Sequence, residues 1–484
     1  MNKPVIRYIL CHVMRIEGAL MLLPLIVAVL YGDPEWVDFA IVAGGLIFLG
    51  SLGTISKPKN NTIYLKEGCV ATSLSWIIMS LFGCLPFYMS GAIPRFTDAL
   101  FETVSGFTTT GASILFDIES LSHSVLFWRS FTHWIGGMGV LVFLLAVVPM
   151  SGGSNINLMR AESPGPSVGK VLPKIKNTAQ ILYLVYLGLT LIEVILLMFG
   201  GMSIFDSLTL SFGTAGTGGF GVKNDSFMSY TPYVQWVAGI FMLLFGINFN
   251  FYCFMLLRQF RKAFTLEEVR KYLLIIATAT AIIFVNILSM YENAFKALTH
   301  AFFQVTSIMT TTGFASADFD TWPTVCKLTL VILMMIGACA GSTGGGIKVS
   351  RFIVLFKSIR KELSSYIHPK IVRKINMDGR PVEHEVVRSI NVFFISFFAV
   401  MVGSTFLVSL DNFDLTTSFT AVVATLDNIG PGLAKVGPTC NYALFSPFSK
   451  YVLILDMIAG RLELFPLLIL FHPRLYAEAF RKNK

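Results

Sequence analysis

The chain has 484 residues, of which 54% are hydrophobic and 13% are charged, whereas an ordinary soluble domain has roughly 45–50% and about 25%. So few charges cannot cover a soluble surface, which excludes an ordinary globular protein and indicates a multi-pass membrane protein. The formal net charge is +9, but Lys and Arg cluster between apolar runs, as at Arg258, Arg261 and Lys262. This clustering is typical of cytoplasmic loops, and we predict no binding of nucleic acid.

Ten apolar runs follow one another along the chain, and most have about the 20 residues that cross a bilayer. With the N-terminus in the cytoplasm, 29 of the 37 Lys and Arg residues fall on the cytoplasmic side, as the positive-inside rule requires. The runs lie near residues 8–30, 37–53, 68–91, 131–150, 179–201, 233–257, 272–291, 328–347, 389–410 and 451–472.

Four outer connections between these runs resemble one another. They read FTDALFETVSGFTTTGAS (96–113), FDSLTLSFGTAGTGGFG (205–221), LTHAFFQVTSIMTTTGFAS (298–316) and FDLTTSFTAVVATLDNIGPG (413–432). Aligning them brings Gly111, Gly219, Gly313 and Gly430 into register. The pattern predicts a unit of span, short helix, glycine turn and span, repeated four times. The predicted divisions are a two-helix segment, 1–67, and pore repeats 68–177, 178–268, 269–388 and 389–484.

The composition of the four connections favours a cation filter. Asp98, Asp206 and Asp414 stand at the expected starts of three of the short helices, where a carboxylate complements the helix dipole. The glycine that follows each helix permits backbone conformations that direct carbonyl oxygens towards an ion. The predicted filter residues are Thr110, Gly111, Gly218, Gly219, Thr312, Gly313, Ile429 and Gly430.

The chain resembles the Trk/Ktr/HKT superfamily of potassium transporters. The resemblance is carried by the four aligned glycines, by GACAGSTGGGIK (337–348) and by GRLELFPLL (460–468). It implies an all-α integral membrane protein of the bacterial cytoplasmic membrane, with four membrane–pore loop–membrane units around a pseudo-fourfold pore and two extra helices before them. It also implies potassium as the transported ion, a homodimer, and a cytosolic ring of nucleotide-binding subunits as partner.

A break in the eighth run is predicted below this filter. Glycine costs a helix about 0.8–1 kcal/mol relative to alanine, and five glycines occur within ten residues. Backbone that is irregular at membrane depth lines water or is buried in protein, so we expect a gate, with close packing of small residues as the alternative. The glycines are Gly337, Gly341, Gly344, Gly345 and Gly346.

Arg461 lies midway along the tenth run, where a charge is costly and usually faces water or the bundle interior. Asp456 and Glu463 are five and two residues away, and at about 100° per residue neither shares its face of a helix. We expect Arg461 to be part of the gate as a cation-repelling barrier; a salt bridge with another span is the alternative.

Three functions are compatible with these features. The leading prediction is potassium uptake through a gated, channel-like pore controlled from the cytosol. The alternatives are a symporter coupled to sodium or protons, with Asp427 as the titratable group, and, more distantly, a membrane-embedded enzyme. GTGGFG (216–221) and GSTGGGIK (341–348) imitate nucleotide-binding motifs, but no strand precedes either. We predict no enzyme activity and no cofactor beyond the transported potassium.

Two further expectations concern the surfaces of the protein. The segment 348–388 carries ten Lys and Arg residues and far fewer acidic ones, so it could dock the cytosolic ring or could simply fix the topology. The seven cysteines are scattered, which predicts neither a zinc site nor a disulfide framework. A Cys326–Cys440 pair on the outer side is conceivable.

Overall fold

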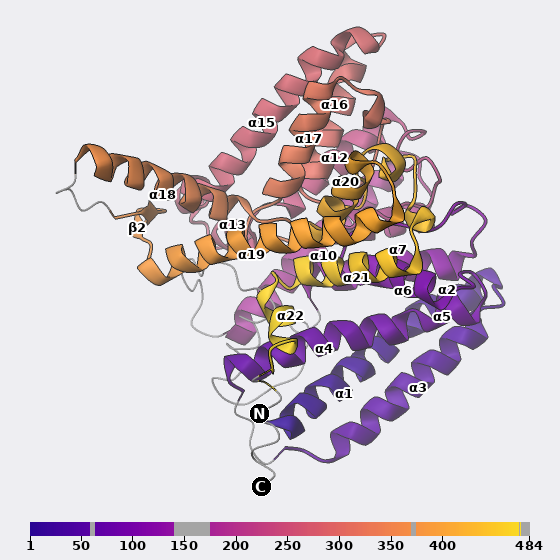
Figure 1. Cartoon of the computed structure of the whole chain (residues 1–484). Helices are drawn as coiled ribbons and strands as arrows, with labels where there is room; N and C mark the ends of the chain where they lie inside the picture. Colours follow the sequence, from indigo (N-terminus) through magenta and orange to yellow (C-terminus); the bar gives the residue numbers. More distant parts are fainter. Residues whose placement is uncertain (59–62, 140–174, 369–373, 474, 476–484) are drawn as a thin grey trace.

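The computed structural model describes the whole chain except residues 59–62, 140–174, 369–373, 474 and 476–484 (Figure 1). Most of the described residues are helical. The α-helices are α1 (Lys3–Leu20), α2 (Leu22–Tyr31), α3 (Trp36–Ile55), α4 (Leu65–Gly83), α5 (Leu85–Met89), α6 (Phe96–Phe107), α7 (His123–Met138), α10 (Ile175–Phe199), α11 (Ile204–Gly216), α12 (Pro232–Phe245), α13 (Phe249–Leu256), α14 (Phe260–Thr265), α15 (Glu267–Ile287), α16 (Ala294–Met309), α17 (Thr324–Ile336), α18 (Val349–Ile367), α19 (His384–Val408), α20 (Leu415–Leu426), α21 (Pro447–Arg461) and α22 (Phe465–Leu470).

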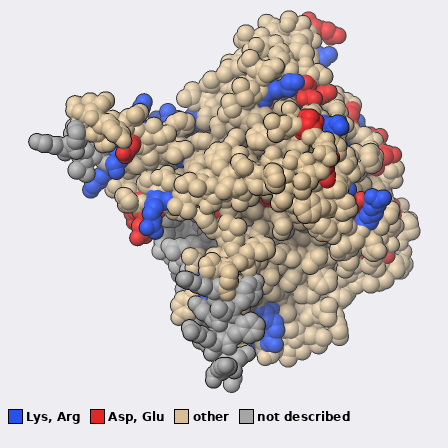
Figure 2. Space-filling view, in the orientation of Figure 1, with Lys and Arg blue, Asp and Glu red and all other residues tan. Residues whose placement is uncertain are grey.

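Six helical stretches among the described residues are long and apolar enough to cross a membrane, or seven if one bent pair counts as a single span. Their outward faces carry large apolar side chains, as at Phe48, Ile195 and Phe406. Figure 2 shows the same property as a broad face with few charged side chains. Exposed apolar surface on this scale is stable in lipid rather than in water, so the chain is a multi-pass membrane protein.

Four short helices, α6, α11, α16 and α20, lie inside the molecule, and most of their residues are buried. Three of them begin at a side chain that accepts a hydrogen bond from the first turn, namely Ser203, Asn293 and Asp414. Asp98 and Asp206 lie in the first turns of α6 and α11, as predicted. Local capping chemistry therefore fixes where most of the buried helices start.

Among the described residues, three of the predicted runs bend sharply or end early as helices. The run 233–257 is divided into α12 and α13, which meet at an angle of 88°, and the side chain of Asn248 caps the second helix at Asn250. The apolar run at 233–257 gave no indication of this bend, because an apolar pattern does not show where a polar side chain caps a new helix. The eighth run ends as a helix at Ile336, before the glycines, and the tenth ends at Arg461.

Smaller departures from the predictions lie elsewhere. Residues Asn376–Met377 (β1) and Arg380–Pro381 (β2) form a two-stranded antiparallel hairpin, so the described chain is mostly helical rather than all-α. Cys326 is buried, Cys440 is exposed, and both are free thiols, so the conceivable disulfide is not formed. The second half of the run 131–150, and most of the loop that follows it, lie outside the described residues.

Candidate functional site

The four glycine turns share one backbone conformation. Two residues before each aligned glycine, φ is positive at Thr109 (56°), Thr217 (54°), Thr311 (60°) and Asn428 (57°). The φ angles of the aligned glycines are also positive, at 78° for Gly111, 82° for Gly219, 86° for Gly313 and 96° for Gly430. Residues with a Cβ adopt positive φ rarely, and the larger values at the four aligned positions favour glycine there.

Each turn is also tied to its helix in the same way. The residue before each glycine donates its N–H to the carbonyl five residues earlier, and the N–O distance is 2.8 Å in all four cases. The pairs are Thr110–Ser105, Gly218–Gly213, Thr312–Ser307 and Ile429–Ala424. Four segments of different sequence therefore fold into one structural unit.

The four turns contact one another in a closed circle. A Cβ added at Gly111 would overlap the carbonyl oxygen of Gly218 in the next turn, and one at Gly219 would overlap that of Thr312. The same relation joins Gly313 to Ile429. The circle closes from the fourth turn to the first, where a Cβ at Gly430 would lie 2.8 Å from the carbonyl oxygen of Thr110. All eight residues predicted as filter lie in these turns.

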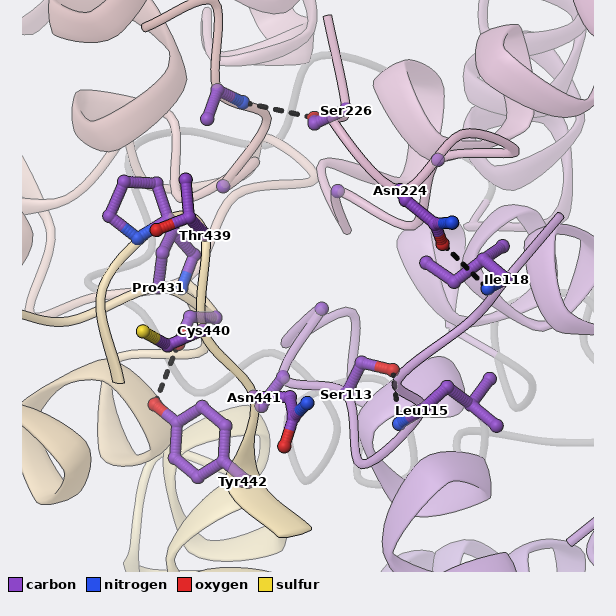
Figure 3. Close-up of a pocket in the computed structure, with 18 of the residues that line it drawn as sticks. Ser113, Leu115, Ile118, Asn224, Ser226, Pro431, Thr439, Cys440, Asn441 and Tyr442 are labelled. Atoms are coloured by element: carbon purple, nitrogen blue, oxygen red, sulfur yellow. Dashed lines mark hydrogen bonds between the residues drawn. The ribbon is translucent and has the colours of Figure 1, made fainter. Parts of the chain in front are cut away.

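The ring of turns opens on an outer cavity of about 130 Å³, which all four aligned glycines line. Figure 3 shows this cavity with residues from three of the loops around it, among them Ser113, Asn224 and Pro431. In the described part of the chain, no cluster of three His, Cys, Asp or Glu residues could hold a metal ion. Backbone oxygens are the ligands that this cavity offers at the glycines, and such oxygens suit a hard cation.

The glycine-rich segment 337–348 lies directly against two of the four turns. The N–H of Gly345 donates to Oγ1 of Thr311 at 2.6 Å, and the N–H of Gly346 donates to the carbonyl of Asp427 at 3.0 Å. Gly337, Gly341 and Gly346 have positive φ, and a Cβ at Gly344 would lie 2.8 Å from the carbonyl oxygen of Thr310. Both freedom of φ and lack of space therefore select glycine in this segment.

The breaks in two spans meet at this segment. The N–H of Cys339 donates to the carbonyl of Gly246 at 3.1 Å, and the N–H of Phe249 donates to the carbonyl of Gly341 at 2.9 Å. Glu268, at the start of α15, accepts from the N–H of Ala340 at 2.7 Å and of Ser350 at 3.1 Å. One buried carboxylate thus contacts both the first part of the segment and the first turn of α18.

Arg461 joins a third break to the same place. It is the last residue of α21, not the middle of a helix as predicted, because the chain turns at Glu463 and Leu464, both with positive φ. Its guanidinium donates to the carbonyl of Thr343 at 3.0 Å, to that of Gly137 at 2.9 Å and to that of Gly136. Arg461 therefore holds the glycine-rich segment against the end of α7.

The two acidic residues near Arg461 have other partners. Asp456 accepts from the hydroxyl of Ser404 at 2.7 Å, and Glu463 forms an ion pair with Arg351 of α18. The geometry agrees with the expectation that neither lies on the face of Arg461. The cation-repelling role expected for Arg461 stays a prediction.

Sequence reasoning missed Glu102, Arg129 and Glu268. Glu102 and Arg129 are 0% and 2% exposed and form an ion pair with an N–O distance of 2.6 Å. Glu268 is 4% exposed. Charged residues inside otherwise apolar segments were the available signal, because such residues are retained at membrane depth only with a partner or a function.

Together the fold and the site define a class: a multi-pass membrane protein built around a ring of four buried helix–turn loops. A family model described as TrkH, cation transport protein, matches residues 39–481. The chain belongs to this family, which confirms the resemblance seen in the sequence and makes the protein a transporter rather than an enzyme.

Known relatives match over nearly their whole length. The chain is 36% identical over 469 residues to the Trk system potassium uptake protein TrkH of Salmonella typhimurium, covering 95% of this chain and 96% of that protein. It is 32% identical to the Trk system potassium uptake protein TrkG of Escherichia coli, with 93% and 94% covered. The crystal structure of the potassium transporter TrkH from Vibrio parahaemolyticus superposes with a TM-score of 0.88 at 31% identity, covering 98% of this chain and 99% of that one.

Proposed function

We propose that this protein takes up potassium across the bacterial cytoplasmic membrane through a gated, channel-like pore. The observation that carries the proposal is the closed circle of four turns with one backbone conformation, open to an outer cavity. The choice of potassium draws on the names of the relatives, which are potassium uptake proteins.

The proposed architecture is four membrane–pore loop–membrane repeats around a pseudo-fourfold axis, preceded by two further membrane helices. The division is 1–67 for the N-terminal pair and 68–177, 178–268, 269–388 and 389–484 for the repeats. It is supported by the common geometry of the four turns and by the position of α1 and α3, which lie side by side at one edge of the molecule (Figure 1).

The proposed filter consists of the two residues of each turn already named, Thr110 and Gly111, Gly218 and Gly219, Thr312 and Gly313, and Ile429 and Gly430. Their carbonyl oxygens would replace the hydration shell of the ion. The turns contain no TVGYG string, and Pro431 follows Gly430 in the fourth, so the ring would offer fewer equivalent ion sites than a tetrameric potassium channel.

The proposed gate is the glycine-rich segment together with Arg461, which donates a hydrogen bond to the carbonyl of Thr343 in that segment. The glycines of the segment are Gly337, Gly341, Gly344, Gly345 and Gly346. Its contacts with Thr311 and Asp427 place it against the ring, and its hydrogen bonds to Glu268 and Arg461 tie it to surrounding helices. Movement of the segment would therefore change the space beneath the filter.

The proposed partners are a second copy of the chain and a cytosolic ring of nucleotide-binding subunits. Support for the ring is that α18 continues directly from the gate segment and extends away from the helical body (Figure 1), with the basic residues Arg360 and Lys361 in its second half. Reversing these charges together with Lys374 and with Arg373, which lies outside the described residues, should abolish ring binding. Retained binding by a correctly inserted variant would contradict this docking surface.

Symport is the second candidate function, and Asp427 is the observation in its favour. This residue precedes the fourth turn, is fully buried, and within the described chain neither carboxylate oxygen has a hydrogen-bond partner. A proton or sodium ion at this carboxylate would satisfy it, because an isolated buried charge is strongly unfavourable. In the pore proposal, the same residue is a neutral acid that supports the turn.

A flux assay in liposomes that contain only this protein separates the candidates. A pore gives downhill potassium flux that needs no second gradient. A symporter concentrates potassium only when a sodium or proton gradient is imposed, and Asp427→Asn should then uncouple it. Potassium movement that depends strictly on a second ion would overturn the pore proposal.

A further inference from the structure

A buried ion pair lies behind the first two turns of the ring. Glu102 belongs to the buried helix α6 and Arg129 to α7, and Nε of Arg129 lies 2.6 Å from Oε1 of Glu102. Desolvating two charges is costly unless further hydrogen bonds satisfy both of them. The other contacts of these two side chains therefore show what the pair holds in place.

The carboxylate of Glu102 holds the first turn. Oε1 accepts from the hydroxyl of Ser113 at 2.9 Å, and Oε2 accepts from the N–H of Ile114 at 2.9 Å. These residues come two and three positions after Gly111. The outer end of the first turn is thus fixed to its own buried helix by charge-assisted hydrogen bonds, which are the stronger kind.

The guanidinium of Arg129 holds the second turn. Nη1 donates to the carbonyl of Gly221 at 2.9 Å, and the guanidinium carbon lies 3.6 Å from the centroid of the Phe220 ring. Gly221 and Phe220 directly follow Gly219. The pair therefore forms a continuous link from Ile114 in the first turn to Gly221 in the second.

One helical turn further along α7, His133 supports the same loop. Its Nε2 accepts from the N–H of Phe220 at 3.2 Å, so its Nδ1 carries the proton and donates to the carbonyl of Gly106 at 2.7 Å. A Cβ at Gly218 would overlap the imidazole ring. Helix α7 thus supports the second turn from behind at two places.

Neutral groups join the turns at other junctions of the ring. The N–H of Ala315 donates to the hydroxyl of Ser226 at 3.1 Å between the second and third turns. Between the fourth and first, Tyr442 donates its N–H to the carbonyl of Ser113 at 2.8 Å and its hydroxyl to that of Gly430 at 2.7 Å. The positions aligned with Glu102 are Leu210, Gln304 and Ala421.

We propose that Glu102 and Arg129 are positioning residues for ion selectivity. By linking Ile114 to Gly221, the pair sets the separation between the first and second turns, and with it the distance between the carbonyls of Thr110 and Gly218. The inference rests on the proposed function, because it assigns to the pair a property of the filter. A looser junction would accept ions of other sizes, so discrimination against sodium would fall more than the maximal rate of uptake.

Three variants, which disrupt the contacts of Glu102 and Arg129 to an increasing degree, test the proposal. Ser113→Ala removes one donor to Glu102. Arg129→Lys keeps the charge, but a single ammonium cannot reproduce the planar fork that reaches Glu102 and Gly221. Glu102→Gln keeps an acceptor for Arg129 and removes one for Ile114. Competitive uptake in proteoliposomes should show the potassium-over-sodium ratio falling in this order, by about tenfold in Glu102→Gln because charge-assisted bonds are lost.

The matched control is Asp98→Asn. Asp98 lies on the same helix and forms an ion pair of the same length, 2.6 Å, with Lys450, but Lys450 lies on α21 and not in a turn. This variant should keep the parental ratio. A change in Asp98→Asn as large as that in Glu102→Gln would overturn the inference, since any ion pair on α6 would then suffice.

The remaining outcomes are also decisive. If Glu102→Gln does not insert correctly, Ser113→Ala and Arg129→Lys carry the test, and an unchanged ratio in both would overturn the inference. A fall in maximal rate with a parental ratio would do the same, since it indicates damage to stability alone. If the parent shows no downhill potassium flux, the proposed function fails first; if the parent is selective and all three variants match it, only the positioning role fails.

Discussion

The outer and inner halves of the central site are built on different principles. In the outer half, four turns of different sequence share the same signs of φ and the same 2.8 Å hydrogen bond, and three of them make the same close contact with the next turn. In the inner half, each break differs: an 88° bend, a glycine-rich segment and a turn after Arg461. Uniform geometry suits a binding ring that must present one set of ligands, whereas the inner breaks are unlike one another and are joined by hydrogen bonds at the glycine-rich segment.

The largest effect is expected at the outer ring. Gly313→Ser places a Cβ against the carbonyl of Ile429 in a turn with φ of 86°. We expect potassium uptake to fall by about a hundredfold, or about 2.8 kcal/mol, in rubidium or potassium uptake assays. Gly403→Ser is the control, because nothing lies within 4 Å of an added Cβ there. Parental uptake and selectivity in well-inserted Gly313→Ser would remove this turn from the filter.

The same comparison predicts an order within the ring. Among the four aligned glycines, Gly430 leaves the most room for a side chain, because an added Cβ would lie 2.8 Å from the nearest carbonyl oxygen. Gly430→Ala should therefore retain more uptake than Gly111→Ala, Gly219→Ala or Gly313→Ala, measured side by side at equal expression. If the four variants were equally damaged, the fourth turn would not be the exception that its contacts indicate.

The inner half should respond in the opposite direction. Arg461→Ala removes charge-assisted hydrogen bonds to Thr343 and Gly137, and each is worth about 1.5–3 kcal/mol. Resting cation flux should rise by about tenfold, and deletion of 341–346 should also raise it and weaken control by any activator. Arg461→Lys, which keeps the charge, should lie between parent and alanine. Parental flux in both the alanine variant and the deletion would show that neither element is a barrier.

A smaller rise is expected from Glu268→Gln. The amide keeps one oxygen acceptor but loses the charge that strengthens the bonds from Ala340 and Ser350, a loss of about 1 kcal/mol. Resting flux should increase a few-fold. Its neighbour Glu267 pairs with Lys357 through partly exposed side chains, so Glu267→Gln should change resting flux less. Equal effects would assign the change to α15 as a whole and not to the bonds of Glu268.

The smallest effect is expected in the outer loops. Asn224 donates to Asp117 at 2.9 Å, and this hydrogen bond lowers the pKa of Asp117. A lowered carboxyl pKa means stability that is present above the ordinary value and is lost as pH falls through the folded value. The difference in Tm between parent and Asp117→Asn should therefore be small and should vanish in acid. A difference that grows as pH falls would contradict this.

The sequence by itself determined the class, the number of glycine turns and the residues in them. Periodic apolar runs are a local signal, and a glycine with positive φ is required by the turn itself, so both are visible before folding. The break after Ile336 was predictable for the same reason, because glycine destabilises a helix wherever it stands.

Only the tertiary structure decided what the turns and breaks contact. The apolar run 233–257 gives no sign of the bend at Asn248. The sequence pattern places Arg461 in the middle of a helix, because it does not show the turn at Glu463. The pairing of Glu102 with Arg129, 27 residues apart, and of Glu268 with Ala340, 72 residues apart, joins separate helices. Such contacts depend on how helices pack, and a single sequence without that packing contains only the charges, not their partners.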